Sequence, residues 1–354
     1  MINNRLFDWY GIDTKKNLQI NTFCTRPFDT VLIDKQGNCF VCECTSWLPQ
    51  SVGNLYLQSL DDIIQSKKTK VLQNSILDHS YRFCNNKQCS YLLYQKKNNP
   101  TPWKKTTPIN LITNIRLAID DSCNLSCPSC RTQIKFEKNK VKLKKLYNLA
   151  DKIINYVKNQ NQQINIHIGS DGDPFASLVY RYFIKKIKDF SNVRFTIQTN
   201  GLLIKKMYYR YEDFFQKLDT LNISIDGATK ETYELLRRGG SYEKIIENLS
   251  IIKDLKKKFN FKLILHFVVQ DKNYKEMVPM IELADHYTVD HLYFNRITNW
   301  NTYKEFSKID VLDSNNKDYQ LCIEEIKKIL KMNEKKVIVG MPTIMTKELF
   351  QNKQ

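Results

Sequence analysis

The chain has 354 residues, enough to bury a substantial core, and its hydrophobic content of 42% is ordinary for a globular protein. No apolar run is long enough to span a membrane, and the first ten residues lack the layout of a signal peptide, so we expect a cytoplasmic protein without a membrane partner. The net charge of +18 invites a nucleic-acid partner. The lysines, however, follow helical stretches and are not interleaved with aromatic residues, so we do not expect nucleic acid as the substrate. An acidic peptide gains as much from such a positive surface.

The first quarter of the chain is rich in cysteine and in turn-forming residues. Thiolates from separated segments can close the four corners of one iron–sulfur cubane, and similar spacings also permit a zinc ribbon. On a strand, Cys42 and Cys44 would share a face, whereas Cys39 would point to the opposite face as a plain small residue. The six cysteines of this region are Cys24, Cys39, Cys42, Cys44, Cys84 and Cys89.

A polar segment with three prolines, residues 98–108, disfavours helix and sheet and is typical of a linker. After it, short apolar runs alternate with amphipathic helical runs, which predicts a parallel sheet covered by helices. The predicted strands are Ile115–Asp120, Asn165–Ser170, Arg194–Thr199, Thr220–Ile225, Lys262–Val269 and His291–Ile297. The predicted helices are Leu143–Asn159, Leu178–Phe190, Lys205–Lys217, Tyr242–Lys257, Tyr274–Tyr287 and Tyr319–Leu330. Six units are too few for a closed eight-stranded barrel and fit either a partial barrel or a doubly wound sheet.

Directly after the first predicted strand, Cys123, Cys127 and Cys130 stand at C-x3-C-x2-C spacing on one loop. Soft thiolate ligands select iron–sulfur clusters or zinc, and three ligands leave a fourth position open for something reactive. The competing interpretation is a zinc loop, but no His or Cys follows closely enough to complete it. Arg131 follows the last cysteine, where it either lies near the cluster or faces solvent.

This motif resembles the signature of the radical S-adenosylmethionine (radical SAM) superfamily, whose [4Fe–4S] cluster binds SAM at its unique iron. The resemblance implies that Cys123, Cys127 and Cys130 hold the cluster. It also implies that one electron, from a donor of the flavodoxin or ferredoxin type, cleaves SAM to a 5′-deoxyadenosyl radical that takes a hydrogen atom from the substrate. For the fold, it favours the partial (β/α)6 barrel over the doubly wound sheet.

Further stretches at the ends of predicted strands resemble motifs of the same family. Residues 171–174 resemble its Gly-Gly-Glu-Pro element, with Asp in place of the first Gly and of the Glu. Residues 199–201 and 224–227 resemble the Thr-Asn-Gly and Ser-Ile-Asp-Gly segments of its peptide-modifying branch. The resemblance thus implies a set of SAM contacts: Gly172, Asp173, Pro174, Thr199, Asn200, Ser224, Asp226 and Arg237.

The N-terminal cysteines resemble the auxiliary iron–sulfur module called SPASM, placed here before the barrel and not after it. The resemblance implies one auxiliary [4Fe–4S] cluster, for which we predict the ligands Cys24, Cys42, Cys84 and Cys89, with Cys44 as an alternative to Cys42. Cys322, in the last predicted helix, is expected in the core, with a role as hydrogen donor as the alternative.

The sequence therefore predicts an α/β protein in which a partial (β/α)6 TIM-like barrel follows a small Cys-rich iron–sulfur module. The predicted division is 1–97 for the module, 98–110 for the linker, 111–300 for the barrel and 301–354 for a C-terminal helical extension. The expected activity is radical SAM modification of a peptide or protein substrate, such as epimerisation or crosslinking. The alternatives are a radical SAM enzyme for a sugar or other small metabolite, and a nucleic-acid-binding protein with structural zinc.

Overall fold

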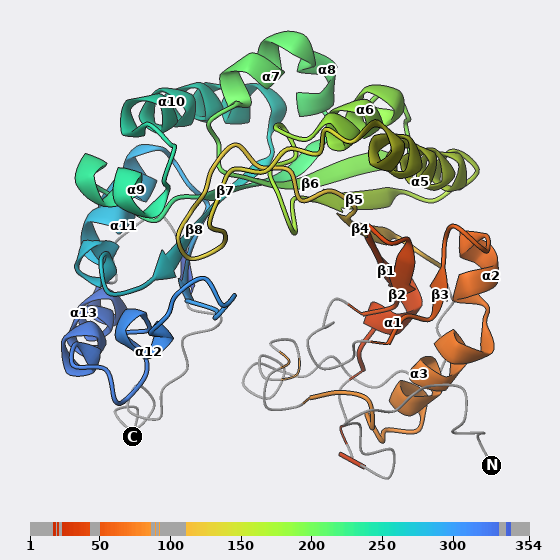
Figure 1. Cartoon of the computed structure of the whole chain (residues 1–354), viewed down its shortest axis with the longest axis horizontal. Coiled ribbons are helices and arrows are strands. Elements are labelled where there is room, and N and C mark those ends of the chain that lie inside the picture. Colours follow the sequence, from red (N-terminus) through yellow and green to blue (C-terminus); the bar gives the residue numbers. More distant parts are fainter. Residues whose placement is uncertain are drawn as a thin grey trace. The chain divides into compact units, whose positions relative to one another are not determined.

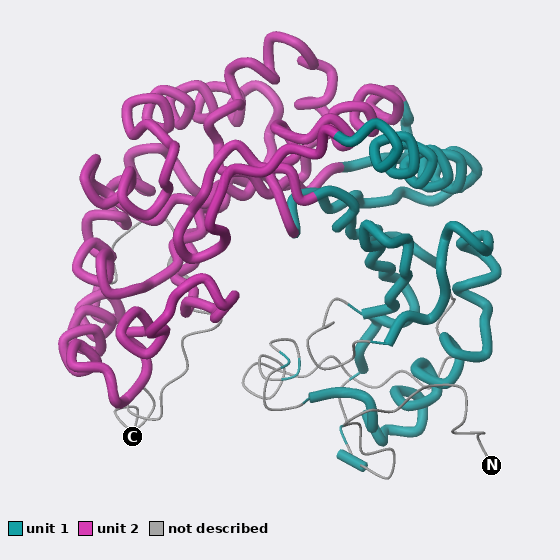
Figure 2. The backbone as a smooth tube through the Cα atoms, viewed as in Figure 1, with its two compact units in different colours: residues 1–120, 139–170, 190–194 teal, residues 121–138, 171–189, 195–354 magenta. Residues whose placement is uncertain are grey.

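The computed structural model describes residues 17–18, 20, 23–42, 50–85, 89, 92, 111–332 and 338–340, so Cys44 and the predicted linker lie outside the described residues. The chain divides into two compact units, shown in Figure 2. Unit 1 comprises residues 1–120, 139–170 and 190–194, and unit 2 comprises residues 121–138, 171–189 and 195–354.

The sheet of unit 1 joins the Cys-rich region to the first two strands predicted for the barrel. Its strands are β1 (Thr30–Asp34), β2 (Asn38–Phe40), β3 (Gly53–Asn54), β4 (Asn114–Ala118) and β5 (Ile164–Ile168), in the order β5-β4-β1-β2-β3. The first three strands pair antiparallel, whereas β1, β4 and β5 run parallel. Leu32 pairs with Phe40 on one side and with Arg116 on the other, so β1 is the strand on which the two halves of this sheet meet.

The helices of unit 1 begin at residues suited to that position. Ser59 and Ser66 accept hydrogen bonds from the backbone N–H groups of Asp62 and Thr69, which satisfies donors that a helix start leaves free. The longest helix, α5 (Lys140–Lys158), buries an apolar stripe that includes Leu149 and Ile153, and its lysines lie on the other faces. These helices are α1 (Arg26–Asp29), α2 (Leu60–Ile64), α3 (Lys67–Leu77) and α5 (Lys140–Lys158).

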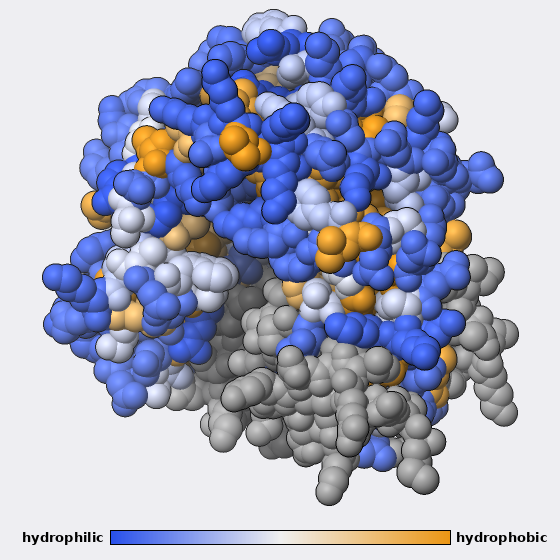
Figure 3. All heavy atoms as spheres, turned by 45° about the vertical axis from the view of Figure 1, so that its right-hand side comes forward, coloured by the Kyte–Doolittle hydropathy of each residue, from blue (hydrophilic) through white to orange (hydrophobic). Residues whose placement is uncertain are grey.

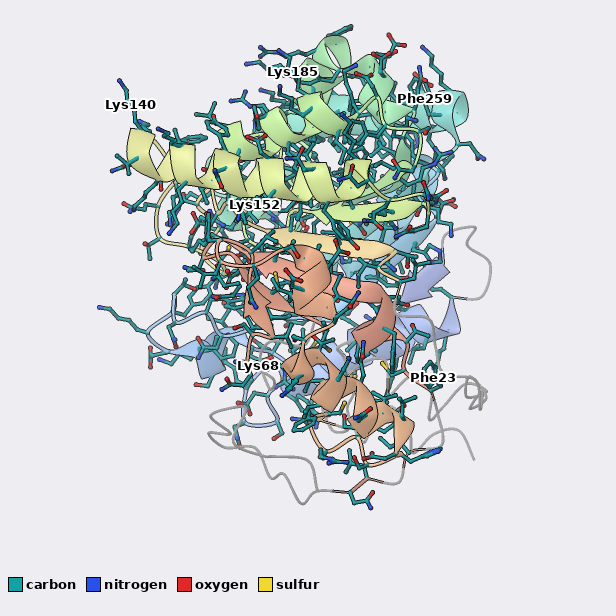
Figure 4. All side chains as sticks on the ribbon, turned by 90° about the vertical axis from the view of Figure 1, so that its right-hand side faces the viewer. Phe23, Lys68, Lys140, Lys152, Lys185 and Phe259 are labelled. Atoms are coloured by element: carbon teal, nitrogen blue, oxygen red, sulfur yellow. The ribbon has the colours of Figure 1, made fainter. Side chains whose placement is uncertain are left out.

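A lysine of α5 ties this helix to the turn that follows β3. The Lys152 ammonium donates to the carbonyl oxygens of Leu55 at 2.8 Å and Tyr56 at 3.3 Å. The Tyr56 hydroxyl donates to the carbonyl of Lys145, whose ammonium lies 4.6 Å from the Tyr56 ring centre. Figure 4 shows Lys152 on α5. The turn after β3 therefore packs against α5 through polar contacts that satisfy two of its carbonyls.

Unit 2 is a run of parallel strands with helical connections. The strands are β6 (Val193–Thr199), β7 (Leu218–Ser224), β8 (Lys262–Val269), β9 (His291–Arg296) and β10 (Ile338–Gly340), paired in that order. The helices are α6 (Leu178–Ile187), α7 (Ile204–Arg210), α8 (Glu212–Phe215), α9 (Lys230–Leu236), α10 (Tyr242–Phe259), α11 (Met277–His286) with the 3-10 turn η2 (Tyr274–Glu276) before it, α12 (Phe306–Ile309) and α13 (Tyr319–Lys331).

The two faces of the unit 2 strands differ in chemistry. On β8, the side chains of Leu263, Leu265 and Phe267 are completely buried, while the alternate residues, such as His266, are only partly buried. Figure 1 shows α9, α10 and α11 on one side of β7 and β8. The helix-covered face is thus apolar, and the other face carries polar side chains such as His266 together with Ile264 and Val268.

All six strands predicted for the barrel are present, in the predicted order and within two residues of their predicted ends. The predicted class is therefore confirmed: an α/β protein with parallel strands and a Cys-rich N-terminal region. One predicted helix, Lys205–Lys217, is divided at Tyr211, which has non-helical backbone angles. Helices α9 and α12 were not predicted.

The two compact units group the strands differently from the predicted domains. The pairing of β1 with β4 places the Cys-rich region in the same unit as the first strand after the linker. The predicted boundaries at 97, 110 and 300 stay predictions. Cys322 is completely buried on α13, as expected for a core residue.

Within the described part of the chain, no helix has both the length and the apolar character that a membrane span requires. The face drawn in Figure 3 is largely hydrophilic, and its hydrophobic patches are separate from one another.

We expect Lys152→Met to lower the free energy of unfolding by about 1.5 kcal/mol, because two carbonyl oxygens lose a charged donor while the aliphatic packing is retained. Lys144→Met, at an exposed position of the same helix, is the matched control and is expected to have little effect. Thermal unfolding of both variants tests this. Equal midpoints for the two variants would contradict a role for Lys152 in holding the turn.

Candidate functional site

The cysteine loop of unit 2 is closed at its base by a short antiparallel bridge. The N–H of Cys123 donates to the carbonyl of Lys135 at 2.7 Å, and the N–H of Lys135 donates back at 3.3 Å. Within the loop, the N–H of Cys130 donates to the carbonyl of Cys127 at 2.9 Å, which puts these two cysteines on one turn. Cys127 is buried, Cys123 is half-buried and Cys130 is exposed. The three thiols therefore belong to one fixed loop that is open to solvent on one side.

Arg238 holds the middle of this loop. Its backbone carbonyl accepts from the N–H of Ser126 at 3.0 Å, and its Nε donates to the Ser126 hydroxyl at 3.1 Å. Its Nη2 donates to the carbonyl of Thr132 at 3.2 Å. The segment after α9 thus fixes the loop on both sides of Cys127.

The predicted Gly-Gly-Glu-Pro-like element packs directly against the start of the cysteine loop. The N–H of Asp173 donates to the carbonyl of Ser122 at 2.8 Å. A Cβ atom added to Gly172 would stand 2.4 Å from the same carbonyl oxygen, so only glycine fits there. Arg131 joins the two segments further, since its Nη1 and Nη2 donate to the carbonyls of Asp121 and Asp171 at 2.8 and 2.6 Å. Of the two positions expected for Arg131, the structure shows the one beside the loop.

The Asp173 carboxylate is enclosed by protein donors. One oxygen accepts from the N–H groups of Phe175 and Ala176, and the other accepts from the Thr199 hydroxyl at 2.6 Å and the Asn200 N–H at 2.8 Å. Burial raises the pKa of this carboxyl, and the four donors act in the opposite direction. The side chains of Asp173 and Thr199 therefore hold the end of β6 against the loop.

Asn200 reaches the cysteine loop itself. Its Nδ2 donates to Asn124 Oδ1 at 2.9 Å and lies 4.0 Å from the sulfur of Cys123. Its Oδ1 accepts from the N–H of Leu202 at 3.1 Å, which fixes the rotamer. The amide thus points a donor at a cysteine sulfur.

Arg237 reaches a second cysteine. Its Nη1 donates to the sulfur of Cys127 over 3.9 Å, and its Nε lies 2.9 Å from a carboxylate oxygen of Asp226. The other Asp226 oxygen accepts from the N–H of Val268 at 2.8 Å. Although burial alone would lower the pKa of Arg237, the Asp226 carboxylate raises it, so the guanidinium stays charged.

The residues around the loop suit a group that offers hydrogen-bond acceptors. The Tyr233 hydroxyl is buried without a hydrogen-bond partner, and the Arg237 Nε has the Asp226 carboxylate 2.9 Å away as its ion-pair partner. Burial raises the pKa of Cys123 to about 11 and also raises the pKa of Cys127, where the charge of Arg237 offsets part of the effect. Ligation therefore has to release protons from these thiols, as thiolate ligation requires. The donor set fits an iron–sulfur cluster with an acceptor-rich ligand beside it.

Ser224 lies apart from the cysteines, on the polar face of the unit 2 strands. Its hydroxyl accepts from Gln198 Nε2 at 3.3 Å, and its register partner on β8 is His266. Of the other predicted SAM contacts, Asn200 lies beside Cys123, Gly172 and Asp173 pack against the start of the cysteine loop, and Thr199 bonds to Asp173. Pro174 is buried next to Asp173, and Arg237, paired with Asp226, lies beside Cys127. Their roles toward SAM stay predictions.

The sequence did not reveal a hydrogen-bonded row on the same face. His266 Nε2 donates to Asn222 Oδ1 at 3.0 Å, and its Nδ1 accepts from Asn295 Nδ2 at 3.2 Å. Burial first, and the charge of Arg237 second, lower the pKa of His266 to about 4, so the imidazole is neutral at physiological pH. The alternation of polar and apolar residues within β7, β8 and β9 is the signal that could have predicted this face.

In unit 1, the structure brings predicted auxiliary ligands together around one apolar cluster. Cys24 lies in this cluster with Phe23, Phe28 and Tyr81, and Cys84 and Cys89 pack against it. The charges of Cys42 and Cys89 act on the Cys24 thiol, whose pKa is raised to about 12, chiefly by burial. Cys39 is completely buried, and its thiol donates to the carbonyl of Gly37. The predicted ligands are thus near one another, and Cys39 has a separate place in the core.

Across the described residues, no three His, Cys, Asp or Glu side chains converge closely enough to bind a single metal ion. A cubane makes a different demand, because each cysteine binds its own iron and the sulfurs stay apart.

We expect Asp173→Asn to lower the free energy of unfolding by about 2 kcal/mol, because the amide turns an N–H₂ group toward protein donors. The variant should also hold iron less well at the cysteine loop, since the end of β6 loses its attachment. Asp171→Asn, at an exposed neighbouring position, is the matched control. Thermal unfolding and iron content measure both effects. An unchanged unfolding midpoint and iron content for Asp173→Asn would show that the carboxylate does not hold the cysteine loop in position.

Two regions of the chain match known protein families. Residues 119–284 match the Radical SAM superfamily, and residues 24–90 match SPASM, an iron-sulfur cluster-binding domain. The GTP 3′,8-cyclase of Lactiplantibacillus plantarum is 25% identical over 182 residues, which are 50% of this chain and 51% of that protein. A probable GTP 3′,8-cyclase of Saccharolobus islandicus is 22% identical over 182 residues, 51% of this chain and 56% of that protein. The chain thus spans about half the length of the curated relatives it matches.

Among solved structures, Streptococcus suis SuiB bound to its precursor peptide SuiA matches with a TM-score of 0.45 and 13% identity, over 82% of this chain and 55% of that chain. The anSMEcpe structure with bound AdoMet and the Cp18Cys peptide matches with a TM-score of 0.40 and 18% identity, over 64% of this chain and 62% of that chain. The radical SAM domain implies SAM and a [4Fe–4S] cluster, and the SPASM domain implies auxiliary cluster binding. The resemblance found in the sequence is therefore confirmed: the chain carries a radical SAM domain, at residues 119–284, and a SPASM domain ahead of it, at residues 24–90.

Proposed function

We propose that this protein reductively cleaves SAM and modifies a peptide or protein substrate. The observation that carries the first part is the cysteine loop, which offers three thiols and is fixed from both sides by Arg238 and by residues 171–173. The cluster and SAM, when bound, supply the radical chemistry. The chain's own residues bind these groups, orient them and exclude water.

Different residues at the cysteine loop bind the cluster and SAM in this proposal. Cys123, Cys127 and Cys130 hold three irons of the cluster, and the fourth is left to SAM. The backbone of residues 172–174 lies beside the start of the cysteine loop, where its carbonyl groups can accept hydrogen bonds from SAM. Ser224 and Arg237 are the side chains that we propose for its methionine carboxylate or ribose, because Arg in particular offers a planar pair of donors.

The polar face of the unit 2 strands is the surface that we propose for the substrate. Its residues include Gln198, Asn222, Ser224, His266 and Asn295, which alternate with the helix-covered apolar residues. The Asn222–His266–Asn295 row is neutral, and its members fix one another's orientation. A surface of oriented amides suits a neutral polar chain, such as a peptide backbone with its own N–H and C=O groups.

The charges near the loop do not favour a highly anionic substrate. A triphosphate needs several cationic side chains that are free to bind it. Here Arg131 donates to two carbonyls, Arg238 donates to Ser126 and Thr132, and Lys135 pairs with Asp121 at 2.7 Å. These cations are engaged in holding the loop.

A nucleoside triphosphate is nevertheless the second candidate substrate, because the curated relatives named GTP 3′,8-cyclase match half of this chain. Incubation of the reconstituted protein with SAM and reductant, in separate reactions with GTP, with free sugars and with candidate peptides, decides between them. Modification of a peptide supports the proposal, and turnover of GTP or of a sugar with no peptide product would overturn its substrate part.

We expect the anaerobically reconstituted protein to form 5′-deoxyadenosine from SAM in the presence of dithionite, and the triple replacement of Cys123, Cys127 and Cys130 by Ala to abolish this. The wild type should hold about eight irons in two cubanes, and the triple variant roughly half of them. Product analysis and iron determination measure both. Continued 5′-deoxyadenosine formation by the triple variant, or iron for one cubane together with zinc in the wild type, would contradict this prediction.

We expect Cys84→Ser with Cys89→Ser to reduce substrate modification more than unproductive SAM cleavage. The reason is that Cys84 and Cys89 belong to unit 1, whereas the cysteine loop belongs to unit 2. A paired assay of 5′-deoxyadenosine and modified peptide measures the ratio. Cys39→Ala, a change at a buried cysteine of the same domain that is not a proposed ligand, is the matched control and should keep both its iron and the ratio. Equal loss of both activities in the folded double variant would mean that the auxiliary cluster does not serve the substrate.

A further inference from the structure

We propose that Asn200 and Arg237 set the reduction potential of the cluster on the cysteine loop, by donating hydrogen bonds to the sulfur atoms of Cys123 and Cys127. This inference rests on the cluster-binding part of the proposed function and is independent of the substrate. It gives both residues a role toward the cluster in addition to any contact with SAM.

The Asn200 donor is held in place from three directions. The Asn200 N–H donates to Asp173, its Oδ1 accepts from Leu202, and one hydrogen of its amide nitrogen goes to Asn124. The remaining N–H of the same nitrogen is the group next to the Cys123 sulfur, at an N···S distance of 4.0 Å. Because the side chain is buried and its other polar atoms are engaged, this donor cannot turn away without breaking the other bonds.

The Arg237 donor is held by a buried carboxylate. The side chain is only 11% exposed, and that of its partner Asp226 only 1%. Asp226 is fixed in turn by the N–H of Val268. The Nη1 group then lies 3.9 Å from the sulfur of Cys127, which is buried.

The third cysteine is different. Cys130 is exposed, so water competes for its sulfur, although Arg131 lies beside it. The electrostatic potential at the sulfurs of Cys123 and Cys127 therefore depends mainly on protein donors, because water competes less there.

Reduction adds one electron to a cluster whose charge is shared by its sulfur atoms. A hydrogen-bond donor or a positive charge at a sulfur stabilises the reduced form more than the oxidised form, which raises the potential. The effect is larger in a site of low dielectric constant, where solvent screens little. Asn200 contributes a dipole, and Arg237 contributes a dipole and a charge that Asp226 partly balances.

The decisive measurement is an anaerobic potentiometric titration followed by electron paramagnetic resonance. The signal of interest is the one absent from the triple cysteine variant, which separates it from an auxiliary cluster. Asn200→Asp changes the N–H donor into a negative oxygen and keeps the acceptor for Leu202. We expect a clearly lower midpoint potential at unchanged iron content.

The matched control is Asn248→Asp. Asn248 is also buried, and its Nδ2 donates to the carbonyl of Gly201 at 2.9 Å, so it holds the same turn without reaching a sulfur. We expect little change in potential. Equal shifts in the two variants would show that turn order or added charge is responsible, and the proposal would be overturned.

A second pair of variants tests the other donor. Arg237→Gln should lower the midpoint potential. Arg238→Gln is the matched control, because it removes a neighbouring, exposed arginine that holds the same loop through Ser126 and Thr132 without donating to a cysteine sulfur. We expect the control to shift the potential less than Arg237→Gln does. If Arg237→Gln or Asn200→Asp fails to load iron, Arg237→Lys and Asn200→Ser give milder changes in the same direction. An iron-loaded protein whose potential is unchanged in both Asn200 and Arg237 variants refutes this inference alone. A wild type whose cysteine loop holds no cluster refutes the proposed function instead.

Discussion

The buried carboxylate of Asp173 is the interaction on which the rest of the site depends. It joins the element after β5, the end of β6 and, through its own backbone N–H, the start of the cysteine loop. A carboxylate can accept several bonds at once, so one side chain fixes three segments that are far apart in sequence. Burying this charge is favourable only because four donors surround it. The Asn200 amide and the start of the cysteine loop therefore take their positions from a group whose carboxylate is bonded to protein donors.

Much of the fold could be predicted from local patterns. The nearly continuous apolar run Lys262–Val269 predicts a strand, and the apolar stripe of Leu143–Asn159 predicts a helix, each from neighbouring residues alone. Both elements are present in the structure. The division of the helix at Tyr211 could not be predicted, because the break shows in the backbone angles of Tyr211 and not in the residue pattern. Short helices such as α9 depend on contacts like the Glu276 carboxylate at its N-terminus, which come from another part of the chain.

For the candidate site too, the sequence predicted what depends on neighbouring residues but not what depends on contacts between distant segments. The cysteine spacing and the motif-like strand ends identified the residues around the loop, because motifs are local. Their partners are not local: Arg237 reaches Cys127 across 110 residues, and Asn200 reaches Cys123 across 77. For Asp173, the sequence indicated a ligand contact where the structure shows a carboxylate already satisfied by protein donors. His266 was missed because a single histidine in a strand carries no motif, and its meaning comes from Asn222 and Asn295 on the neighbouring strands.

The parallel pairing of β1 with β4 has a consequence for how the chain acquires its structure. Thr30 pairs with Asn114, so the ladder closes a loop of more than eighty residues, and the entropy of that closure precedes any gain from the contacts. During synthesis, β1 and β2 leave the ribosome long before β4 does. In that interval β1 has one unpaired edge, with Val31 and Ile33 uncovered, although both are completely buried in the finished sheet. The Cys-rich region is therefore made first but can complete its fold only after the first strand of the following domain has appeared.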